Sequence, residues 1–194
     1  RQRQMCIRDR IAIDPTTGVT AIGLPSESKV LLVRDITKGV RADAEYSTSG
    51  APAYLGWTRV DGKPVLLLNT QKSSQLHLLD ADLKLIGSIT LAEAAVGPFA
   101  VAANGGQFAY YARGRGHGTG IARVDLKDMK DLGLIETNDR TDSQWLGLSP
   151  DGQFLYGHRS GGSPTGIYAW RITEQAGRPK LEKVKDGHDS ASGY

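Results

Sequence analysis

Cysteine is nearly absent from this chain of 194 residues, whose single cysteine is Cys6. Residues 11–194 contain none, which excludes disulfide bonds and cysteine-rich zinc sites from this part of the chain. Long apolar runs are absent as well, because none approaches the roughly 18 residues that a membrane-spanning helix requires. The sequence therefore predicts no membrane insertion of this segment.

An excess of one charge is also missing from most of the chain. The net charge is +3 and the pI is about 9.0, but residues 1–10, RQRQMCIRDR, hold four arginines and one aspartate. The remaining 184 residues contain 20 basic and 20 acidic side chains. Because this part is neutral, its charge does not favour a nucleic-acid partner, and none is expected.

The first ten residues differ in character from the rest. The string RQMCIRDR resembles translated sequencing-adapter read-through at the ends of open reading frames from metagenome assemblies. Residues 1–10 are therefore interpreted as an artefactual tail of a truncated bacterial, metagenomic sequence, and they are set aside from fold reasoning. The alternative is a natural basic tail that binds nucleic acid or a membrane.

An internal repeat dominates the remaining sequence. The segment GQFAYYARGRGHGTGIA at 106–122 returns 46 positions later as GQFLYGHRSGGSPTGIY at 152–168. Aromatic residues open short apolar runs at Tyr54, Phe99 and Trp145, at gaps of 45 and 46, and are expected in the core. Turns such as Asp61-Gly62 follow these runs, as in β-hairpins.

Each repeat contains four short runs that predict strands. The runs are five to eight residues long, rich in Val, Ile, Leu and aromatic residues, and bounded by Gly, Pro, Asn and Asp. Two segments, 90–96 and 125–132, are compatible with a single helical turn and are placed in loops between strands. Four strands in about 45 residues are typical of one blade of a β-propeller.

The motif SPDGQFLY at 149–156 is similar to the Ser-Pro-Asp-Gly turn of WD-repeat-like bacterial propellers, including the Tol-system and YVTN lactonase-like groups. The resemblance covers 11–194 and implies an all-β fold, a β-propeller of four-stranded antiparallel blades. About four blades are present, in a fragment of a seven- or eight-bladed ring, and a closed four-bladed ring is the alternative. The Trp-Asp dipeptide of true WD repeats is absent.

The period also predicts the blade boundaries. The expected blades are 11–50, 51–96, 97–140 and 141–186. Because Asp142-Ser143 recurs as Asp189-Ser190, residues 187–194 are expected to begin a further blade.

Two basic, glycine-rich stretches, 112–120 and 158–166, are expected to join the second and third strands of neighbouring blades. Equivalent connections of a propeller lie on one face, where guanidinium groups and glycine amides suit carboxylates or phosphates. The candidate ligand-binding residues are Arg113, Arg115, His117, His158 and Arg159. The alternative is that glycine serves the hairpin turn and the arginines are solvated.

Motifs for catalysis and metal binding are not found. No Gly-x-Ser-x-Gly is present, and no histidine has a partner at metal-ligand spacing. Asp35, Asp80 and Asp125 end the third run of successive repeats, which is compatible with a ring of metal ligands. We interpret them as acceptors for backbone amides of the following turns. No catalytic residue, metal or cofactor is predicted.

The sequence favours a non-catalytic protein- or ligand-binding scaffold that presents loops on one face, with a protein or acidic peptide as partner. One alternative is a lactonase-like propeller enzyme, whose site lies at the central channel. Another is a sensor propeller of a larger multidomain protein. A bacterial periplasmic and a cytoplasmic location fit the composition equally.

Overall fold

The computed structural model describes residues 10–39, 41–95, 97–113, 120–137, 145–159, 166–175 and 178–185. The side chains of a few residues at strand ends, His158 and Arg159 among them, are not described. The segments 1–9 and 186–194 lie outside the described residues, and so do both copies of the Asp-Ser pair at 142–143 and 189–190.

The described strands form four sheets, antiparallel except for one strand pair in the last, which we number as blades 1 to 4 in chain order. Blade 1 contains β1 (Arg10–Ile13), β2 (Thr20–Leu24), β3 (Lys29–Val33) and β4 (Ala44–Ser47). Blade 2 contains β5 (Pro52–Val60), β6 (Lys63–Thr70), β7 (Gln75–Leu79) and β8 (Leu85–Thr90). Blade 3 contains β9 (Ala100–Val101), β10 (Phe108–Ala112), β11 (Ile121–Asp125) and β12 (Lys130–Leu134). Blade 4 contains β14 (Trp145–Leu148), β15 (Phe154–Arg159), β16 (Gly166–Gln175), β17 (Arg178–Lys185) and β13 (Glu136–Thr137).

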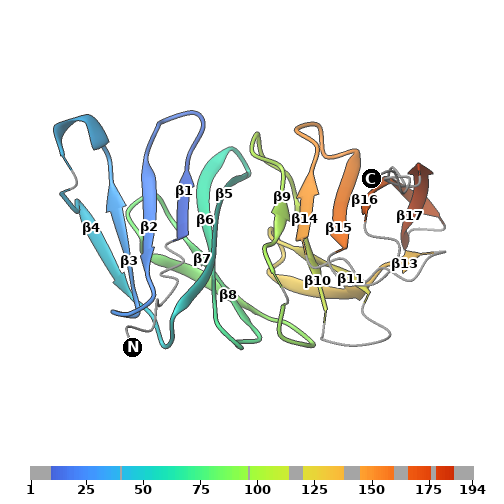
Figure 1. Ribbon diagram of the computed structural model, residues 1–194, viewed down its shortest axis with the longest axis horizontal. Helices are drawn as coiled ribbons and strands as arrows, with labels where there is room; N and C mark the ends of the chain where they lie inside the picture. Colours follow the sequence, from blue (N-terminus) through green and yellow to red (C-terminus); the bar gives the residue numbers. More distant parts are fainter. Residues whose placement is uncertain are drawn as a thin grey trace, which may run out of the picture.

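The four blades are arranged as an open arc. The first strands of the blades, β1, β5, β9 and β14, lie side by side near the middle of Figure 1, and the remaining strands of each blade fan outward. Blades 1 and 4 occupy the two ends of this arc. Four-stranded antiparallel sheets packed radially in this way form a β-propeller of about four blades, as predicted.

One connection departs from the simple repeat. After β12 the chain leaves blade 3, and β13 pairs in parallel with β17 at the outer edge of blade 4. Blade 4 therefore has five strands. The added strand covers the free edge of β17, which would otherwise expose unpaired backbone groups.

The burial of the residues in a strand depends on the position of that strand within its blade. In β6 the last six residues are buried, since a sheet covers each face of blade 2. The outer strand β4 instead alternates between half-buried and exposed residues. The β5–β6 turn places Asp61 at φ 50° and Gly62 at φ 77°, the two successive positive values that a two-residue hairpin requires.

Apolar clusters fill the three interfaces between blades. Tyr54 of blade 2 packs on Phe99 of blade 3, with ring centroids 5.3 Å apart, and both are buried as expected. Trp145 was expected in the core too, but this expectation is wrong, because Trp145 is exposed. It lies on the face of blade 4 that points away from blade 3.

Hydrogen bonds from side chains also join neighbouring blades. Each interface contains at least one: Trp57 Nε1 to Ala12 O at 3.2 Å, Thr58 Oγ1 to Ala102 O at 2.9 Å, and Arg123 Nη1 to Glu174 Oε1 at 2.8 Å.

The periodic aspartates serve the turns, which confirms their interpretation as backbone acceptors. Asp80 Oδ1 accepts from the amides of Asp82 and Lys84, both at 2.8 Å. Asp125 Oδ1 likewise accepts hydrogen bonds from the amides of Lys127 and Asp128. Asp35 Oδ1 accepts one from the amide of Thr37.

The sequence missed one short element, the 3₁₀ helix η1 (Ile36–Lys38), which Asp35 caps. Among the described residues of 90–96 and 125–132 there is no helical turn, and 126–129 form a turn between β11 and β12.

Candidate functional site

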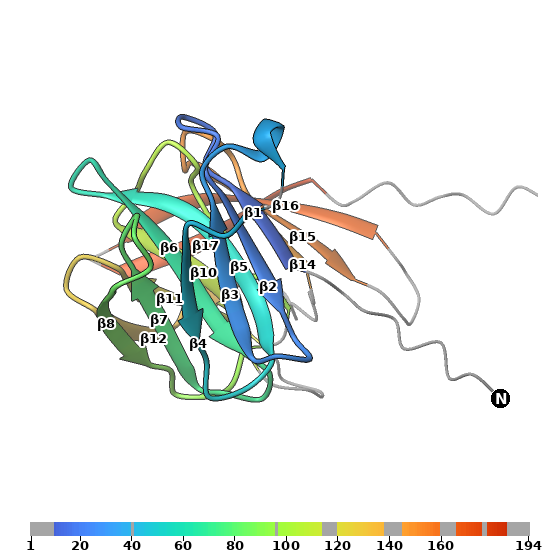
Figure 2. The ribbon, with the colours of Figure 1, turned by 90° about the vertical axis from the view of Figure 1, so that its left-hand side faces the viewer.

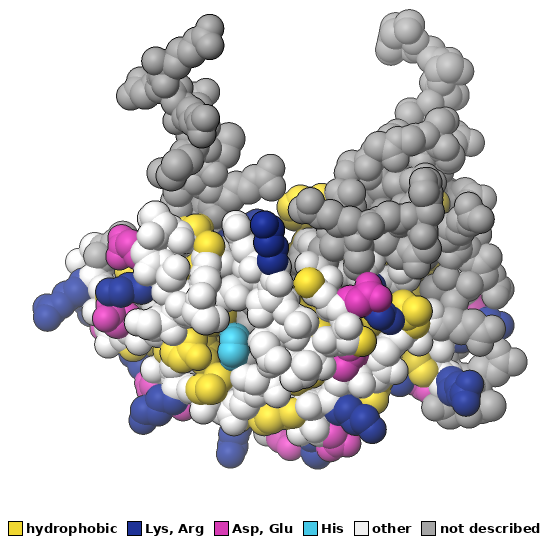
Figure 3. Space-filling view, turned by 90° about the horizontal axis from the view of Figure 1, so that it is seen from below, with side chains coloured by type: hydrophobic (Ala, Val, Ile, Leu, Met, Phe, Trp, Pro, Cys, Tyr) yellow, Lys and Arg dark blue, Asp and Glu magenta, His cyan; other side chains and the backbone are white. Residues whose placement is uncertain are grey.

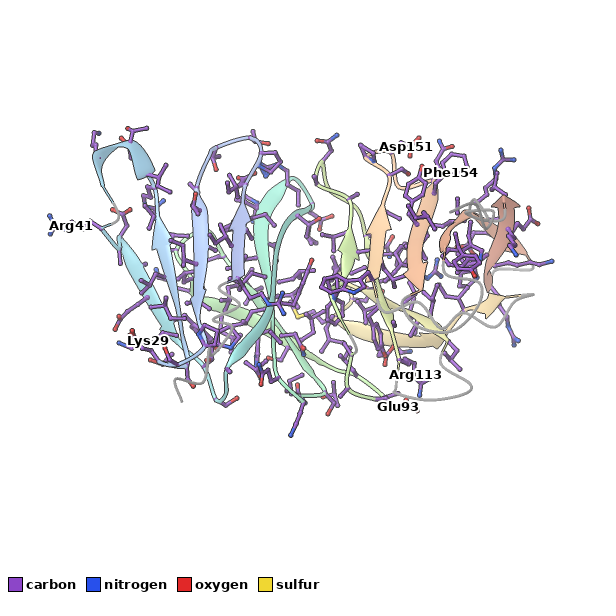
Figure 4. All side chains as sticks on the ribbon, in the orientation of Figure 1. Lys29, Arg41, Glu93, Arg113, Asp151 and Phe154 are labelled. Atoms are coloured by element: carbon purple, nitrogen blue, oxygen red, sulfur yellow. The ribbon has the colours of Figure 1, made fainter. Side chains whose placement is uncertain are left out.

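The predicted loops belong to one end of the arc. The β2–β3 and β6–β7 connections lie at the foot of Figure 1, and we call this side the lower end. The shared strand order places the end of β10 and the start of β11 there too, and likewise the end of β15 and the start of β16, because these are second and third strands of their blades. The residues that join them, 114–119 and 160–165, lie outside the described residues. Figure 4 shows Lys29, Glu93 and Arg113 at the lower end, and Asp151 and Phe154 at the opposite, upper end.

Arg113 is the one predicted site residue whose side chain is described. Its amide donates to Gly120 O at 3.0 Å, and the residue forms an isolated bridge with Ala95. Its Nη2 donates to Glu93 Oε1 at 2.7 Å, while Nε finds no partner among the described residues. The side chain is only 16% exposed. Arg113 is therefore fixed in place, and the alternative of a freely solvated arginine does not hold for it.

The described residues do not test whether the five predicted residues come together. Arg115 and His117 lie outside the described residues. The backbone of β15 extends through His158, which is paired with Ile167, and Arg159, which is paired with Gly166. Both were expected in a loop, but they belong to the strand. Their grouping with Arg113 stays a prediction.

The described part of the lower end is mixed in charge. Figure 3 looks onto this end and shows basic and acidic side chains interspersed along its rim. Lys29, for example, pairs with Glu45 at 3.3 Å.

The upper end carries a pocket that the sequence analysis did not identify. Its volume is about 300 Å³, and it lies between the β5–β6 turn of blade 2 and the β9–β10 loop of blade 3. Its lining residues are Arg59, Val60, Asp61, Gly62, Asn104, Gly105, Gly106, Gln107 and Lys127. The sequence did show the two turns that form this pocket, at 60–62 and 104–106, because each follows the first apolar run of its repeat.

Each cation in this pocket already has an acidic partner. Arg59 Nη2 lies 3.3 Å from both carboxylate oxygens of the buried Asp14, and Lys127 Nζ lies 3.1 Å from Asp61 Oδ1. Gly105, at φ 105°, lets the β9–β10 loop approach the backbone of Arg59. The pocket therefore offers paired charges and peptide groups, which suit a small neutral polar group better than a free anion.

Burial shifts the pKa of several buried or partly buried side chains between blades. Burial raises the pKa of Tyr54, and burial together with the hydrogen bond to Asp131 raises the pKa of Tyr111. Burial lowers the pKa of His77, whose Nδ1 lies 2.8 Å from Ser88 Oγ. None of these residues lines the pocket.

Within the described ranges no group of three or more His, Cys, Asp or Glu side chains could hold a metal ion. Across the same residues no helix is long and apolar enough to cross a membrane.

Comparison with known proteins supports the fold alone. No protein-family model matches the chain, and no curated protein sequence matches it. The chain resembles the solved structure of hydrazine synthase from Kuenenia stuttgartiensis with a TM-score of 0.66 and 21% identity, covering 90% of this chain and 48% of that one.

Two further solved structures have the same fold. The WD40 domain of Toxoplasma gondii coronin matches with a TM-score of 0.63 and 17% identity, over 90% of this chain and 43% of that one. A protein assigned as a 6-phosphogluconolactonase from Bacteroides fragilis matches with a TM-score of 0.65 and 13% identity, over 92% of this chain and 54% of that one. The chain thus spans about half the length of these chains, and the likeness shows a WD40-like and lactonase-like β-propeller fold.

Proposed function

We propose that this chain is a non-catalytic propeller scaffold that binds an acidic protein or peptide through its lower end. The observation that carries the proposal is the fixed position of Arg113, whose backbone and guanidinium bond to Gly120 and Glu93. A guanidinium held in place loses little conformational freedom when it binds. Guanidinium groups also pair with carboxylates in two parallel hydrogen bonds.

Arg115, His117, His158 and Arg159 complete the proposed site. All four belong to the same pair of connections between second and third strands, either as part of a connection or at the strand end that leads into it. Glu93 offsets one positive charge, so the remaining basic residues supply the attraction for an acidic ligand.

The test is fluorescence anisotropy with a labelled oligoglutamate peptide. Replacing Arg113, Arg115 and Arg159 together by alanine should weaken binding at least about tenfold, because several charge-assisted hydrogen bonds are lost. The matched control replaces Lys63, Lys127 and Arg178 by alanine, which removes the same charge outside the connections between second and third strands. Equal weakening by both triple variants would contradict a specific site at the lower end. Preferential binding of oligouridylate would contradict a protein partner.

Lactone hydrolysis is a second candidate, favoured by the similarity to two proteins assigned as 6-phosphogluconolactonases, from Bacteroides fragilis and Bacteroides uniformis. Propellers host many activities on one fold, so the activity needs its own test. Continuous titration of acid release from 6-phosphogluconolactone measures it directly. A rate clearly above the spontaneous one would replace the non-catalytic proposal.

A further inference from the structure

The pocket between blades 2 and 3 lies at the upper end, whereas the proposed function concerns the lower end. Figure 1 shows the β5–β6 turn next to the β9–β10 loop at the top of the molecule, and Figure 2 shows both connections at the upper end from the side of blade 1. The volume of the pocket, about 300 Å³, lies at the small end of the range for ligand sites, roughly 300–1,000 Å³. The pocket therefore suits a ligand no larger than a single ring.

The pocket exists because the β9–β10 loop contains only short side chains. At the junction of blades 1 and 2, the long side chain of Arg59 reaches across to Asp14, and both side chains are largely buried, at 18% and 4% exposed. At the junction of blades 2 and 3, residues 102–106 are Ala-Ala-Asn-Gly-Gly. None of these five described residues has a side chain long enough to fill the corresponding space, so an opening is left.

Hydrogen bonds hold the walls of the pocket in place. The buried carboxylate of Asp125 accepts hydrogen bonds from Gln107 Nε2 at 2.6 Å and from the amide of Lys127 at 2.9 Å. The amide of Gly106 donates to Arg59 O at 3.2 Å, which ties the β9–β10 loop to the end of β5. A site whose walls are already fixed loses little conformational freedom when a ligand binds.

Both hydrogen-bond donors and acceptors remain available in this pocket. Gln107 Oε1 is an acceptor, the Asn104 carboxamide is both a donor and an acceptor, and neither has a hydrogen-bond partner among the described residues. Lys127 Nζ lies 3.1 Å from Asp61 Oδ1, and both side chains are more than half exposed, at 55% and 63%. Each member of this ion pair can therefore form further hydrogen bonds to a ligand.

The ion pair favours one kind of ligand. A carboxylate or phosphate that approaches Lys127 is repelled by Asp61, and an amine that approaches Asp61 is repelled by Lys127, so neither gains a free counter-charge. A hydroxyl group avoids this conflict, because it can accept a hydrogen bond from the ammonium group and donate one to the carboxylate. A ring that carries adjacent hydroxyls and no charge therefore matches the pocket.

We propose that this pocket binds the ring of a neutral monosaccharide. Hydroxyls of the sugar bond to Lys127 and Asp61 on one side and to the carboxamides of Asn104 and Gln107 on the other. None of the described residues that line the pocket is aromatic, so the ring has no flat apolar surface to stack on. We therefore expect weak binding, with a dissociation constant on the order of 1 mM.

Titration of the isotope-labelled 194-residue chain, followed by the amide chemical shifts in NMR spectra, tests the proposal. The probe is methyl β-glucoside, and its charged counterparts are methyl β-glucuronide and methyl β-glucosaminide. The amides of Gly62, Gly105 and Gly106 should shift with the neutral probe, which should bind at least about fivefold more tightly than either charged probe. No shift of these amides at about 100 mM methyl β-glucoside, or equal affinity for the three probes, would overturn the proposal.

Two substitutions separate recognition by the ion pair from a structural effect. Asp61→Asn leaves Lys127 unpaired and should reverse the preference in favour of the glucuronide, and asparagine tolerates the φ of 50° at this position. Lys127→Met leaves Asp61 unpaired and should reverse the preference in favour of the glucosaminide. The matched control is Lys29→Met, which breaks the pair with Glu45 at the lower end and should change none of the three affinities. An unchanged preference for the neutral probe in both pocket variants would contradict the proposed site.

Discussion

At the scale of single residues, the contacts between blades depend on polar side chains that the repeat places about one period apart. Asp14 and Arg59 are 45 residues apart and meet across the interface of blades 1 and 2. Asp14 also accepts from the amide of Thr16 at 3.1 Å and the hydroxyl of Thr17 at 2.7 Å. One buried carboxylate thus closes a turn and joins two blades.

Replacing Asp14 by alanine should lower the free energy of unfolding by about 3 kcal/mol, because it leaves the largely buried Arg59 unpaired and the turn donors unsatisfied. Urea denaturation followed by circular dichroism measures this loss. The control is Asp35→Ala, which removes a similar turn acceptor at an exposed position and should cost much less. Equal losses in the two variants would show that Arg59 contributes nothing to the effect of Asp14.

The ionisation of Tyr111 should lower the stability of the folded protein at alkaline pH. Burial raises the pKa of Tyr111 above its ordinary value of 10.0, and the hydrogen bond from its hydroxyl to Asp131 Oδ2, 2.8 Å long, raises it further. The hydroxyl of Tyr111 therefore loses its proton at a lower pH in the unfolded chain than in the folded one. Its contribution to the free energy of unfolding is full below pH 10 and declines as the pH rises towards the pKa of Tyr111 in the folded protein.

The urea midpoint of the wild type should accordingly fall between pH 9 and 11. In Tyr111→Phe, which has no hydroxyl to ionise, the fall should be shallower although the starting stability is lower. Parallel declines for the two proteins would assign the alkaline loss to other groups.

At the scale of elements, the tight turns decide how closely neighbouring loops approach. Gly62 has φ 77° and open space around its Cβ position, so only the backbone conformation requires glycine there. Gly105 has φ 105°, and a Cβ would lie 3.0 Å from Arg59 Cβ and 3.1 Å from Arg59 O. Gly50 has neither constraint, since its Cβ would be in ordinary contact with Thr70.

Alanine at these three glycines should therefore produce a graded series of unfolding free energies. We expect little change for Gly50→Ala, a loss of about 1 kcal/mol for Gly62→Ala, and about 2 kcal/mol or more for Gly105→Ala. Chemical denaturation of the three variants under one condition gives the order. A loss for Gly62→Ala no larger than that for Gly50→Ala would show that the β5–β6 turn relaxes without cost.

At the scale of the whole molecule, the arc has two kinds of blade. Blades 2 and 3 are covered on both faces by described blades, while blades 1 and 4 are covered on one face each. Local opening requires less buried apolar contact to be broken at the ends of the arc. Stability should therefore fall from the middle of the arc to its ends.

Amide hydrogen exchange read by mass spectrometry measures this gradient. In dilute protein, β6, β7, β10 and β11 should exchange most slowly, and β1, β2, β14 and β15 faster. Uniform exchange across all four blades would show that the arc unfolds as a single unit with no weaker ends.

The sequence by itself determined the local order of this protein. Four strands per blade were predicted from the short apolar runs, the 45-residue period and the turn residues. The aspartates that accept hydrogen bonds from turn amides were predicted as well. Strands and turns could be predicted because they depend on backbone conformation and on residues that are near in the sequence. The connections between second and third strands were predicted for the same reason, and with them the backbone position of Arg113.

Only the tertiary structure decided which side of each sheet is covered. Tyr54 and Trp145 look alike in the repeat, yet one is buried and the other exposed, since burial depends on whether another blade packs against the face. The pairing of Arg113 with Glu93 and of Arg59 with Asp14 was equally hidden from the sequence. The Arg113–Glu93 pair joins segments 20 residues apart beside the Ala95–Arg113 bridge, and the Arg59–Asp14 pair joins segments 45 residues apart where blade 1 packs on blade 2.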